Sequence, residues 1–235
     1  MSPQLLRVEN VTKRFGGFVA LDGVSLEIAE GERLGVIGPN GAGKSTLTNC
    51  ITGLLRPEAG RVHFAGGDVT ALPAHARARL GLARSFQLPR PFHSMTLAEN
   101  LAIPRDYAAR HDPPEPRALL ERLGLGAKAD ALPRSLTQIE LRKLEVARAL
   151  AGQPRLLICD EAMAGLSHAE VDEMLGVLFA LNESGIAILM IEHIMRAVMR
   201  FSERIVVLDA GRKIADGAPD AILRDKEVER AYLGA

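Results

Sequence analysis

The sequence lacks the features that mark a membrane-embedded or secreted protein. Its longest apolar runs, such as IAILMI at 186–191, fall far short of the roughly 20 residues that a membrane-spanning helix needs. The start of the chain, MSPQLLRVENVTKRF, is interrupted by charges and does not form the apolar segment of a signal peptide. We therefore expect a soluble chain that is not secreted.

Cysteine is scarce, and histidine does not occur in metal-binding patterns. Cys50 and Cys159 both lie inside apolar stretches at unrelated spacing, which predicts buried, reduced thiols in a cytosolic protein. The six histidines are scattered without the spacing of metal ligands, so we expect no zinc site. The sequence also contains no internal repeat and no low-complexity tract.

An excess of charge of either sign is missing as well. The chain has 29 basic and 29 acidic side chains, a balance that disfavours non-specific nucleic-acid binding but leaves room for a local patch. We expect no nucleic-acid partner. With 47% hydrophobic and 25% charged residues, the 235-residue chain is typical of a globular protein with one α/β core or a core and a smaller domain.

Short apolar runs that alternate with helical segments predict the core. Strands are expected at 33–38, 61–66, 82–86, 155–159, 187–192 and 204–209, and helices at 44–55, 136–150 and 169–183. Continuously apolar strands of this kind are typical of a parallel sheet covered by helices on both faces. Residues 88–134 are rich in proline and contain short helical stretches, which predicts an inserted, mainly helical subdomain.

The segment 136–150 combines a helix start with an amphipathic pattern. Thr137 and Glu140 form a capping box, in which each side chain satisfies a backbone N–H group at the helix start. Four apolar residues recur at helical spacing: Leu141, Leu144, Ala147 and Ala151. Charged residues surround them and predict a packed surface helix: Arg142, Lys143, Glu145 and Arg148.

A phosphate-binding loop is the strongest motif of the chain. Residues 38–45 satisfy the pattern G-x-x-x-x-G-K-[ST] between a predicted strand and a predicted helix. Glycines let backbone N–H groups approach phosphate oxygens closely, and the helix start adds its positive dipole end. Lys44 is expected to contact the β- and γ-phosphates, and the Ser45 hydroxyl to bind magnesium. A simple glycine turn capped by Ser45 would not explain the lysine.

Polar residues follow three other predicted strands. Asp160 and Glu161 end the run LLICDE, at the carboxyl end of a predicted strand. In open α/β sheets, ligands bind at the carboxyl ends of the strands. We expect Asp160 to hold magnesium, directly or through water, and Glu161 to act as general base on the attacking water. His193, after AILMIE, could reach a γ-phosphate, and Gln87 follows LARSF. Taken alone, the acids could form a solvated turn, His193 a cap, and Gln87 a polar loop.

These elements, in this order, resemble the ATP-binding subunits of ABC transporters over nearly the whole chain. The resemblance identifies 38–46 as Walker A, LLICDE as Walker B with the catalytic glutamate, Gln87 as the Q-loop and His193 as the H-loop. It implies ATP and Mg²⁺ as cofactors, with Ser45, Gln87 and Asp160 as metal ligands. The nucleotide would contact Gly38, Pro39, Asn40, Gly41, Ala42, Gly43, Lys44, Ser45, Thr46, Gln87 and, from a neighbouring subunit, Thr137.

The same resemblance implies the architecture. The implied fold is an α/β P-loop NTPase with a mainly parallel central sheet, an N-terminal antiparallel β-subdomain and an inserted α-helical subdomain. Residues 1–235 would then form one nucleotide-binding domain, with the helical subdomain at approximately 88–150 and a C-terminal tail at approximately 215–235. Phe15 is expected to stack on adenine, with Phe18 as the alternative and ordinary core packing as the competing interpretation.

The resemblance also places LTQIE (136–140) at the ABC signature, usually LSGGQ, whose helix start contacts the γ-phosphate held by the opposite subunit. It therefore implies a head-to-tail dimer with two composite sites. Gln138 and Ile139 replace both glycines, and Glu140 could repel the phosphate. We therefore expect asymmetry, in which this chain's Walker residues and a partner's intact signature form the competent site. Ser167 replaces the usual D-loop aspartate, which could alter communication between the sites.

The subfamily is indicated by FQLPRPFHSMTLAENL, DEAMAGL, IEHIM and the terminus ERAYLGA, which look like the ATPases of branched-chain amino acid uptake. This resemblance implies three kinds of partner: a second ATPase subunit in a heterodimer or homodimer, integral-membrane permease subunits, and an indirectly associated substrate-binding protein outside the membrane. It also implies a peripheral location on the cytoplasmic membrane face. A lipopolysaccharide-export ATPase shares much of the pattern. Two further alternatives are a soluble ABC ATPase acting on nucleic acid or ribosomes, and a regulatory subunit with little turnover.

Overall fold

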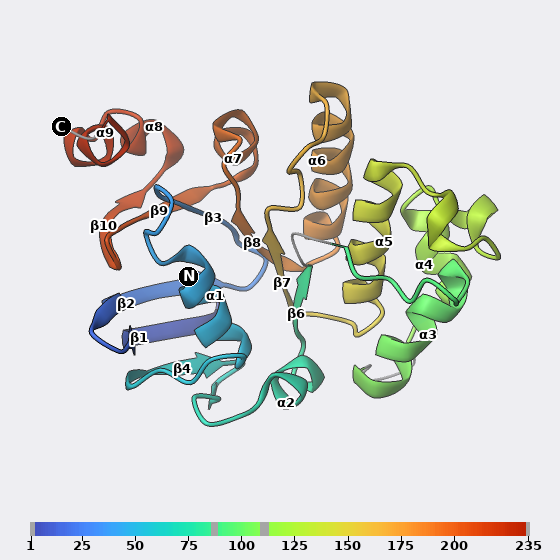
Figure 1. Cartoon of the computed structure of the whole chain (residues 1–235), viewed down its shortest axis with the longest axis horizontal. Coiled ribbons are helices and arrows are strands. Elements are labelled where there is room, and N and C mark those ends of the chain that lie inside the picture. The colour runs from blue at the N-terminus through green and yellow to red at the C-terminus, as the bar shows by residue number, and fades with distance from the viewer. Residues whose placement is uncertain (1–2, 86–88, 109–112, 234–235) are drawn as a thin grey trace.

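The computed structural model describes residues 3–85, 89–108 and 113–233, arranged around two β-sheets (Figure 1). The strands are β1 (Gln4–Phe15), β2 (Phe18–Ala29), β3 (Arg33–Ile37), β4 (Ala59–Phe64), β5 (Gly67–Asp68), β6 (Leu82–Ser85), β7 (Leu156–Asp160), β8 (Ala187–Ile191), β9 (Arg204–Asp209) and β10 (Arg212–Gly217). The helices are α1 (Lys44–Thr52), α2 (Ala74–Arg79), α3 (Leu97–Ala108), α4 (Pro116–Arg122), α5 (Gln138–Leu150), α6 (His168–Glu183), α7 (Met195–Phe201), α8 (Pro219–Ile222) and α9 (Lys226–Leu233), with 3₁₀ turns at Gly126–Lys128 and Pro133–Ser135.

The central sheet confirms the prediction of a mainly parallel core. Its strand order is β10-β9-β3-β8-β7-β6, and all neighbours are parallel except the edge strand β10, which is antiparallel to β9. The antiparallel N-terminal sheet is also confirmed, with the order β2-β1-β4-β5. The apolar patterns did not predict β10 or the short helices α2, α7, α8 and α9, because these segments are short or carry many polar residues.

Both faces of the central sheet are buried, which explains the continuously apolar strands. On β7, Leu156 and Ile158 belong to the core that includes α1 and the N-terminal sheet. The alternate residues Leu157 and Cys159 belong to a second core with α5, α6 and α7. Successive side chains of a strand point to opposite faces, so each face needs its own apolar partners. In Figure 1, α1 lies between the two sheets while α6 and α7 lie across the central sheet from it.

Helix α5 partly contradicts its sequence pattern. The capping box is confirmed: the Thr137 side chain accepts from the Glu140 N–H, and the Thr137 N–H donates to the Glu140 carboxylate at 2.9 Å. The expectation of a surface helix is wrong, because Arg142, Lys143 and Glu145 are only 7%, 8% and 5% exposed. Neighbouring elements supply polar partners for these side chains, which amphipathic periodicity within one helix cannot reveal.

Candidate functional site

The loop from Gly38 to Gly43 connects β3 to α1 in a conformation that requires glycine. Gly38 and Gly43 have φ angles of 154° and 103°, and Gly43 is the N-cap residue that precedes α1. A Cβ atom would lie 2.2 Å from the Leu208 carbonyl oxygen at Gly38 and 2.6 Å from the Ala20 carbonyl oxygen at Gly43. Backbone packing therefore excludes larger side chains at both positions.

Lys44, the first residue of α1, folds back over this loop. Its Nζ donates to the carbonyl oxygens of Gly38 at 2.6 Å and Pro39 at 3.1 Å, and the residue is 7% exposed. Burial lowers the pKa of the Lys44 ammonium, and the nearby carboxylates of Glu161 and Asp160 oppose that shift. The cation is therefore held within the loop and next to the two acids.

The remaining loop residues differ in exposure. Asn40, Gly41 and Ser45 are exposed, Pro39 and Thr46 are partly buried, and Ala42 is buried. The Ala42 carbonyl accepts from the Gly211 N–H at 3.1 Å, which ties the loop to the β9–β10 turn. The exposed hydroxyl of Ser45 thus lies beside an anchored backbone.

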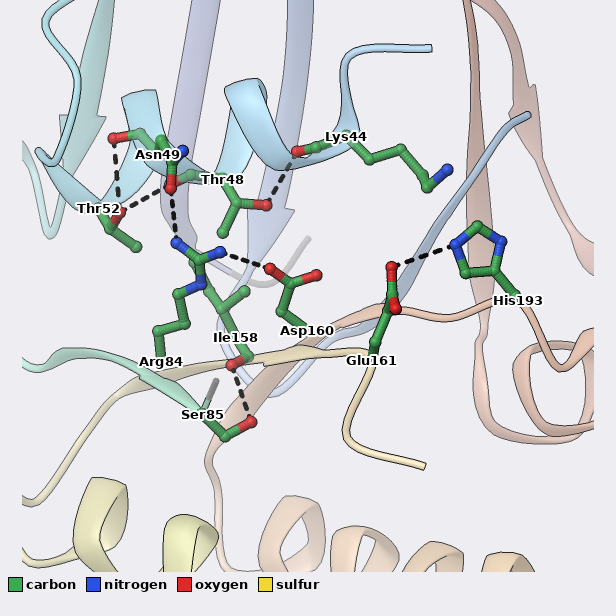
Figure 2. Close-up of polar contacts among 10 residues, drawn as sticks. All are labelled: Lys44, Thr48, Asn49, Thr52, Arg84, Ser85, Ile158, Asp160, Glu161 and His193. Atoms are coloured by element: carbon green, nitrogen blue, oxygen red, sulfur yellow. Dashed lines mark hydrogen bonds and ion pairs between the residues drawn. The ribbon is translucent and has the colours of Figure 1, made fainter. Parts of the chain in front are cut away.

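The carboxyl ends of β7 and β8 bring Asp160, Glu161 and His193 to the same edge of the sheet as this loop (Figure 2). His193 Nε2 lies 3.2 Å from Glu161 Oε1. Glu161 has a φ angle of 49°, a left-handed conformation that is uncommon for a residue with a side chain. Its N–H donates to the Ile191 carbonyl at 2.8 Å, so the end of β8 helps to hold this turn. Strained backbone of this kind is concentrated at functional sites.

Sequence reasoning missed Arg84, which lies inside the site. Its guanidinium donates to Asn49 Oδ1 on α1 at 2.7 Å and to Asp160 Oδ2 at 2.5 Å (Figure 2). The Arg84 and Asp160 side chains are 12% and 9% exposed. The only available signal was a charged residue in the run LARSF, which by itself does not indicate a partner far along the chain.

A cavity of about 710 Å³ opens beside these groups and is lined by Ser45, Asn49, Arg84 and Asp160. The Ser45 hydroxyl and the Asp160 carboxylate are oxygen donors of the kind that Mg²⁺ prefers, and Mg²⁺ commonly takes one or two carboxylates together with substrate phosphates. The donor set on this wall therefore fits magnesium. The cavity continues outward between α1 and α2 on one side and α3 and α5 on the other.

Glu192 is a second residue that sequence reasoning missed. It is 3% exposed, and its Oε1 accepts from the Met163 N–H at 2.8 Å. Burial raises the pKa of Glu192 to about 7, with a smaller contribution from the charge of Glu161, while backbone N–H groups and Arg142 oppose the shift. Arg142 donates to the Ala164 carbonyl at 3.0 Å. Together Glu192 and Arg142 hold the turn that follows Glu161.

Thr137 and Ser167 are both used as helix caps. The Glu140 carboxylate at the start of α5 also pairs with Lys128 Nζ at 2.6 Å, and the Lys128 hydrogen bond is the main reason that the pKa of Glu140 is lowered. Ser167 and Glu170 form a matching capping box at the start of α6. Gln138 Nε2 approaches the Ala164 carbonyl at 3.4 Å, so the start of α5 lies against the turn after Walker B.

The expected adenine-stacking residues are on the surface. Phe15 is 49% and Phe18 62% exposed, and Lys13 Nζ lies 5.5 Å from the Phe15 ring centroid. This exposure argues against core packing as their role. Gln87, the other expected nucleotide and metal contact, lies outside the described residues.

Two further expectations concern the whole chain. Cys50 and Cys159 are free and buried, as predicted, and burial raises their thiol pKa values to about 11 and about 12. None of the helices in the described part of the chain has the length and apolar character to cross a membrane.

Comparisons with known proteins agree with this geometry. The ABC transporter family profile matches residues 21–164. The high-affinity branched-chain amino acid transport ATP-binding protein BraF of Pseudomonas aeruginosa is 37% identical, with 100% of this chain and 99% of that protein covered. The lipopolysaccharide export system ATP-binding protein LptB of Acidithiobacillus ferridurans is 36% identical, with 98% and 97% covered.

A solved structure gives the same result at the level of the fold. The ADP conformation of MJ1267, an ATP-binding cassette of an ABC transporter, superposes with a TM-score of 0.89 at 33% identity and covers 100% of both chains. The α/β P-loop fold expected from the motifs is thereby confirmed. The chain belongs to the ABC transporter family and is an ATP-binding and ATP-hydrolysing subunit.

Proposed function

We propose that this chain is an ATPase subunit of an importer for branched-chain or other hydrophobic amino acids, and that it uses ATP with Mg²⁺. The observation that carries the ATPase chemistry is the convergence of the 38–45 loop, Asp160, Glu161 and His193 at one sheet edge. Full-length similarity to BraF supports the amino acid substrate class. Export of lipopolysaccharide is the second candidate, because LptB is nearly as similar.

The loop and Lys44 bind the phosphates in this proposal. Backbone N–H groups of the loop and the start of α1 contact the phosphate oxygens, and Lys44 exchanges its carbonyl contacts for the β- and γ-phosphates. Ser45 and Asp160 hold Mg²⁺, with Gln87 as a further ligand. The metal supplies charge neutralisation at the phosphates. Phe15 stacks on the adenine.

Glu161 and His193 carry the hydrolytic step. The Glu161 carboxylate orients a water molecule and takes up its proton as the water oxygen attacks the γ-phosphorus. The bond between the γ-phosphorus and the oxygen that bridges to the β-phosphate breaks, so that ADP and phosphate leave. His193, which lies 3.2 Å from the Glu161 carboxylate, fixes its position and contacts the γ-phosphate. The turn geometry of Glu161 limits the positions that its side chain can adopt.

The helical segment and the cavity connect hydrolysis to a membrane permease. In our proposal residues 88–150 form a subdomain within the single 1–235 domain, and residues 215–235 form a tail. The permease contacts the outer part of the cavity, between α2 and α3. Exposed apolar side chains near this mouth, Leu54 and Tyr107 at 53% and 72%, favour a protein partner. The chain then lies on the cytoplasmic membrane face, with a substrate-binding protein acting from the other side.

A second ATPase subunit completes the sites, and the two sites are unequal. The Glu140 carboxylate accepts the Thr137 N–H at the start of α5 and pairs with Lys128. A γ-phosphate from the partner would approach this carboxylate, and the two negative charges would repel each other at the same helix start. Thr137 is therefore a weak contact for the partner's nucleotide, while this chain's Walker residues pair with a partner's intact signature. A heterodimer fits this asymmetry.

The substrate class is tested by transport. The chain is co-expressed with the permease and ATPase genes next to it, and uptake of labelled leucine is measured in vesicles beside ATP hydrolysis. Leucine-stimulated hydrolysis and uptake are expected, and both are lost with Glu161→Gln. Hydrolysis stimulated by lipopolysaccharide but not by leucine would assign the export role, and co-purification with nucleic acid at moderate salt would support a soluble ABC ATPase.

The asymmetry has its own test. Gln138 and Ile139 are replaced by glycine together with Glu140→Gln in the assembled transporter, which removes the carboxylate cap and restores backbone approach. We expect higher ATPase activity from a second competent site. Unchanged activity would discard the asymmetry and leave the substrate proposal intact.

A further inference from the structure

Arg84 joins two parts of the nucleotide site that are distant in sequence. Its guanidinium bridges Asn49, one turn after Ser45 on α1, and Asp160 at the end of β7 (Figure 2). Strand β6 sets this position, because Arg84 lies beside Ile158 in the parallel register with β7. The guanidinium thus reaches along the cavity wall to the carboxylate that is a candidate metal ligand.

The carboxylates around this contact already have cationic neighbours. Arg84 donates to Asp160, and the Lys44 ammonium lies near the charges of Glu161 and Asp160 (Figure 2). A divalent cation entering alone would add two positive charges beside a guanidinium, and it would compete for the Asp160 carboxylate. Nucleotide phosphates would bring the compensating negative charge with the metal. Low exposure of Arg84 and Asp160 limits screening by water, so the repulsion is not negligible.

We propose that Arg84 is the internal counter-ion of Asp160 and makes Mg²⁺ binding depend on nucleotide, an inference that rests on the magnesium site proposed above. Without nucleotide, Arg84 holds the carboxylate and disfavours the metal. With phosphates bound as well, their negative charge would offset the cations, and Asp160 would then be available to hold the metal. Arg84 thus acts on the reaction through Asp160 and is not a catalytic residue.

A purely structural strut would behave differently. If Arg84 only oriented Asp160 for the metal, its removal would weaken metal binding with and without nucleotide. If it competes with the metal, its removal strengthens metal binding in the nucleotide-free protein. The sign of the change in metal affinity therefore separates the two roles, independently of ATPase activity.

The test is a titration of the nucleotide-free full chain with Mn²⁺, a paramagnetic substitute for Mg²⁺ whose unbound fraction is read by electron paramagnetic resonance. Wild type is compared with Arg84→Met and Arg84→Lys. The matched control is Arg148→Met, since Arg148 lines the same cavity but pairs with Glu145. A double variant, Arg84→Met with Asp160→Asn, checks that the metal is held by Asp160.

We expect Arg84→Met to bind one Mn²⁺ per chain at least tenfold more tightly than wild type, and the double variant to lose this site. Arg84→Lys keeps the charge but not the forked geometry of the guanidinium, so its Mn²⁺ affinity should lie between those of wild type and Arg84→Met. If Arg84→Met does not fold, the Mn²⁺ affinity of Arg84→Lys decides the question. Arg148→Met should match wild type. Equal or weaker Mn²⁺ binding by both Arg84 variants would overturn the proposal.

The same samples separate this inference from the proposed function. Binding of a fluorescent ATP analogue in the presence of Mn²⁺ is measured for wild type. If wild type fails to bind the analogue, the proposed nucleotide site itself is wrong. If wild type binds it and removal of Arg84 leaves Mn²⁺ affinity unchanged, only the role of Arg84 is wrong.

Discussion

Replacing Glu192 by glutamine should change how the stability of the protein depends on pH. Glu192 is almost fully buried at the end of β8 and accepts the Met163 N–H. Arg142 faces it with a positive charge and Glu161 with a negative one, and burial is the largest influence on its pKa. Glutamine keeps an oxygen acceptor for the Met163 N–H but cannot ionise, so the variant isolates the charge.

The size of the effect follows from the raised pKa. The pKa of Glu192 is about 7 in the folded protein against an ordinary value of 4.5. Between these values the folded state binds more protons than the unfolded state, so the free energy of unfolding falls as pH rises from about 4.5 to about 7. Each pKa unit corresponds to about 1.4 kcal/mol, so Glu192→Gln should gain about 2 to 3 kcal/mol relative to wild type between pH 5 and pH 8.

Urea unfolding at pH 5, 6, 7 and 8 measures this difference for wild type and Glu192→Gln. The control is Glu183→Gln, which makes the same substitution at a solvent-exposed position at the end of α6. A Glu192→Gln difference that stays constant from pH 5 to pH 8 would refute the assignment of a raised pKa to Glu192.

Three further changes test other contacts. Arg77 is 1% exposed and donates to four backbone carbonyls, including those of Cys50 and Ile51 at the end of α1. Arg77→Met should therefore lower the free energy of unfolding, measured in urea, by about 3 kcal/mol. Arg79→Met, at an exposed position of the same helix, should change it little. Gly38→Ala should abolish binding of a fluorescent ATP analogue, because its Cβ would meet a backbone oxygen at 2.2 Å; normal binding would contradict the close packing of the loop. Cys50 and Cys159 should react with a thiol reagent at pH 8 only after unfolding, and rapid reaction in the native protein would contradict their burial.

Local chemistry made much of the core and the phosphate loop predictable. The loop at 38–45 has a recognisable sequence pattern because phosphate binding requires its glycines and its lysine at fixed positions within a few residues. The strands β3, β7, β8 and β9 were predicted because burial on both faces makes them continuously apolar. The capping box of Thr137 and Glu140 was predicted for the same reason, since both partners lie within one helical turn.

Contacts between distant parts of the chain could not be predicted in this way. Arg84 and Asp160 are 76 positions apart, and only the pairing of β6 with β7 brings them together. The burial of Lys143 depends on Glu173 of α6, at 2.5 Å, which a pattern within α5 does not contain. The environment of Glu192 depends on the turn after Glu161, where the Met163 N–H donates to its carboxylate, and the pattern of 187–192 does not contain this partner.

In our proposal ATP binds at the 38–45 loop, and Glu161 is needed to hydrolyse it. The most direct measurement is the amount of nucleotide that remains bound to Glu161→Gln after incubation with Mg²⁺ and ATP, followed by removal of free nucleotide and identification of the bound species. We expect this variant to retain intact ATP, whereas wild type releases ADP and phosphate. Release of phosphate by Glu161→Gln at the wild-type rate, or absence of bound nucleotide from both proteins, would contradict it.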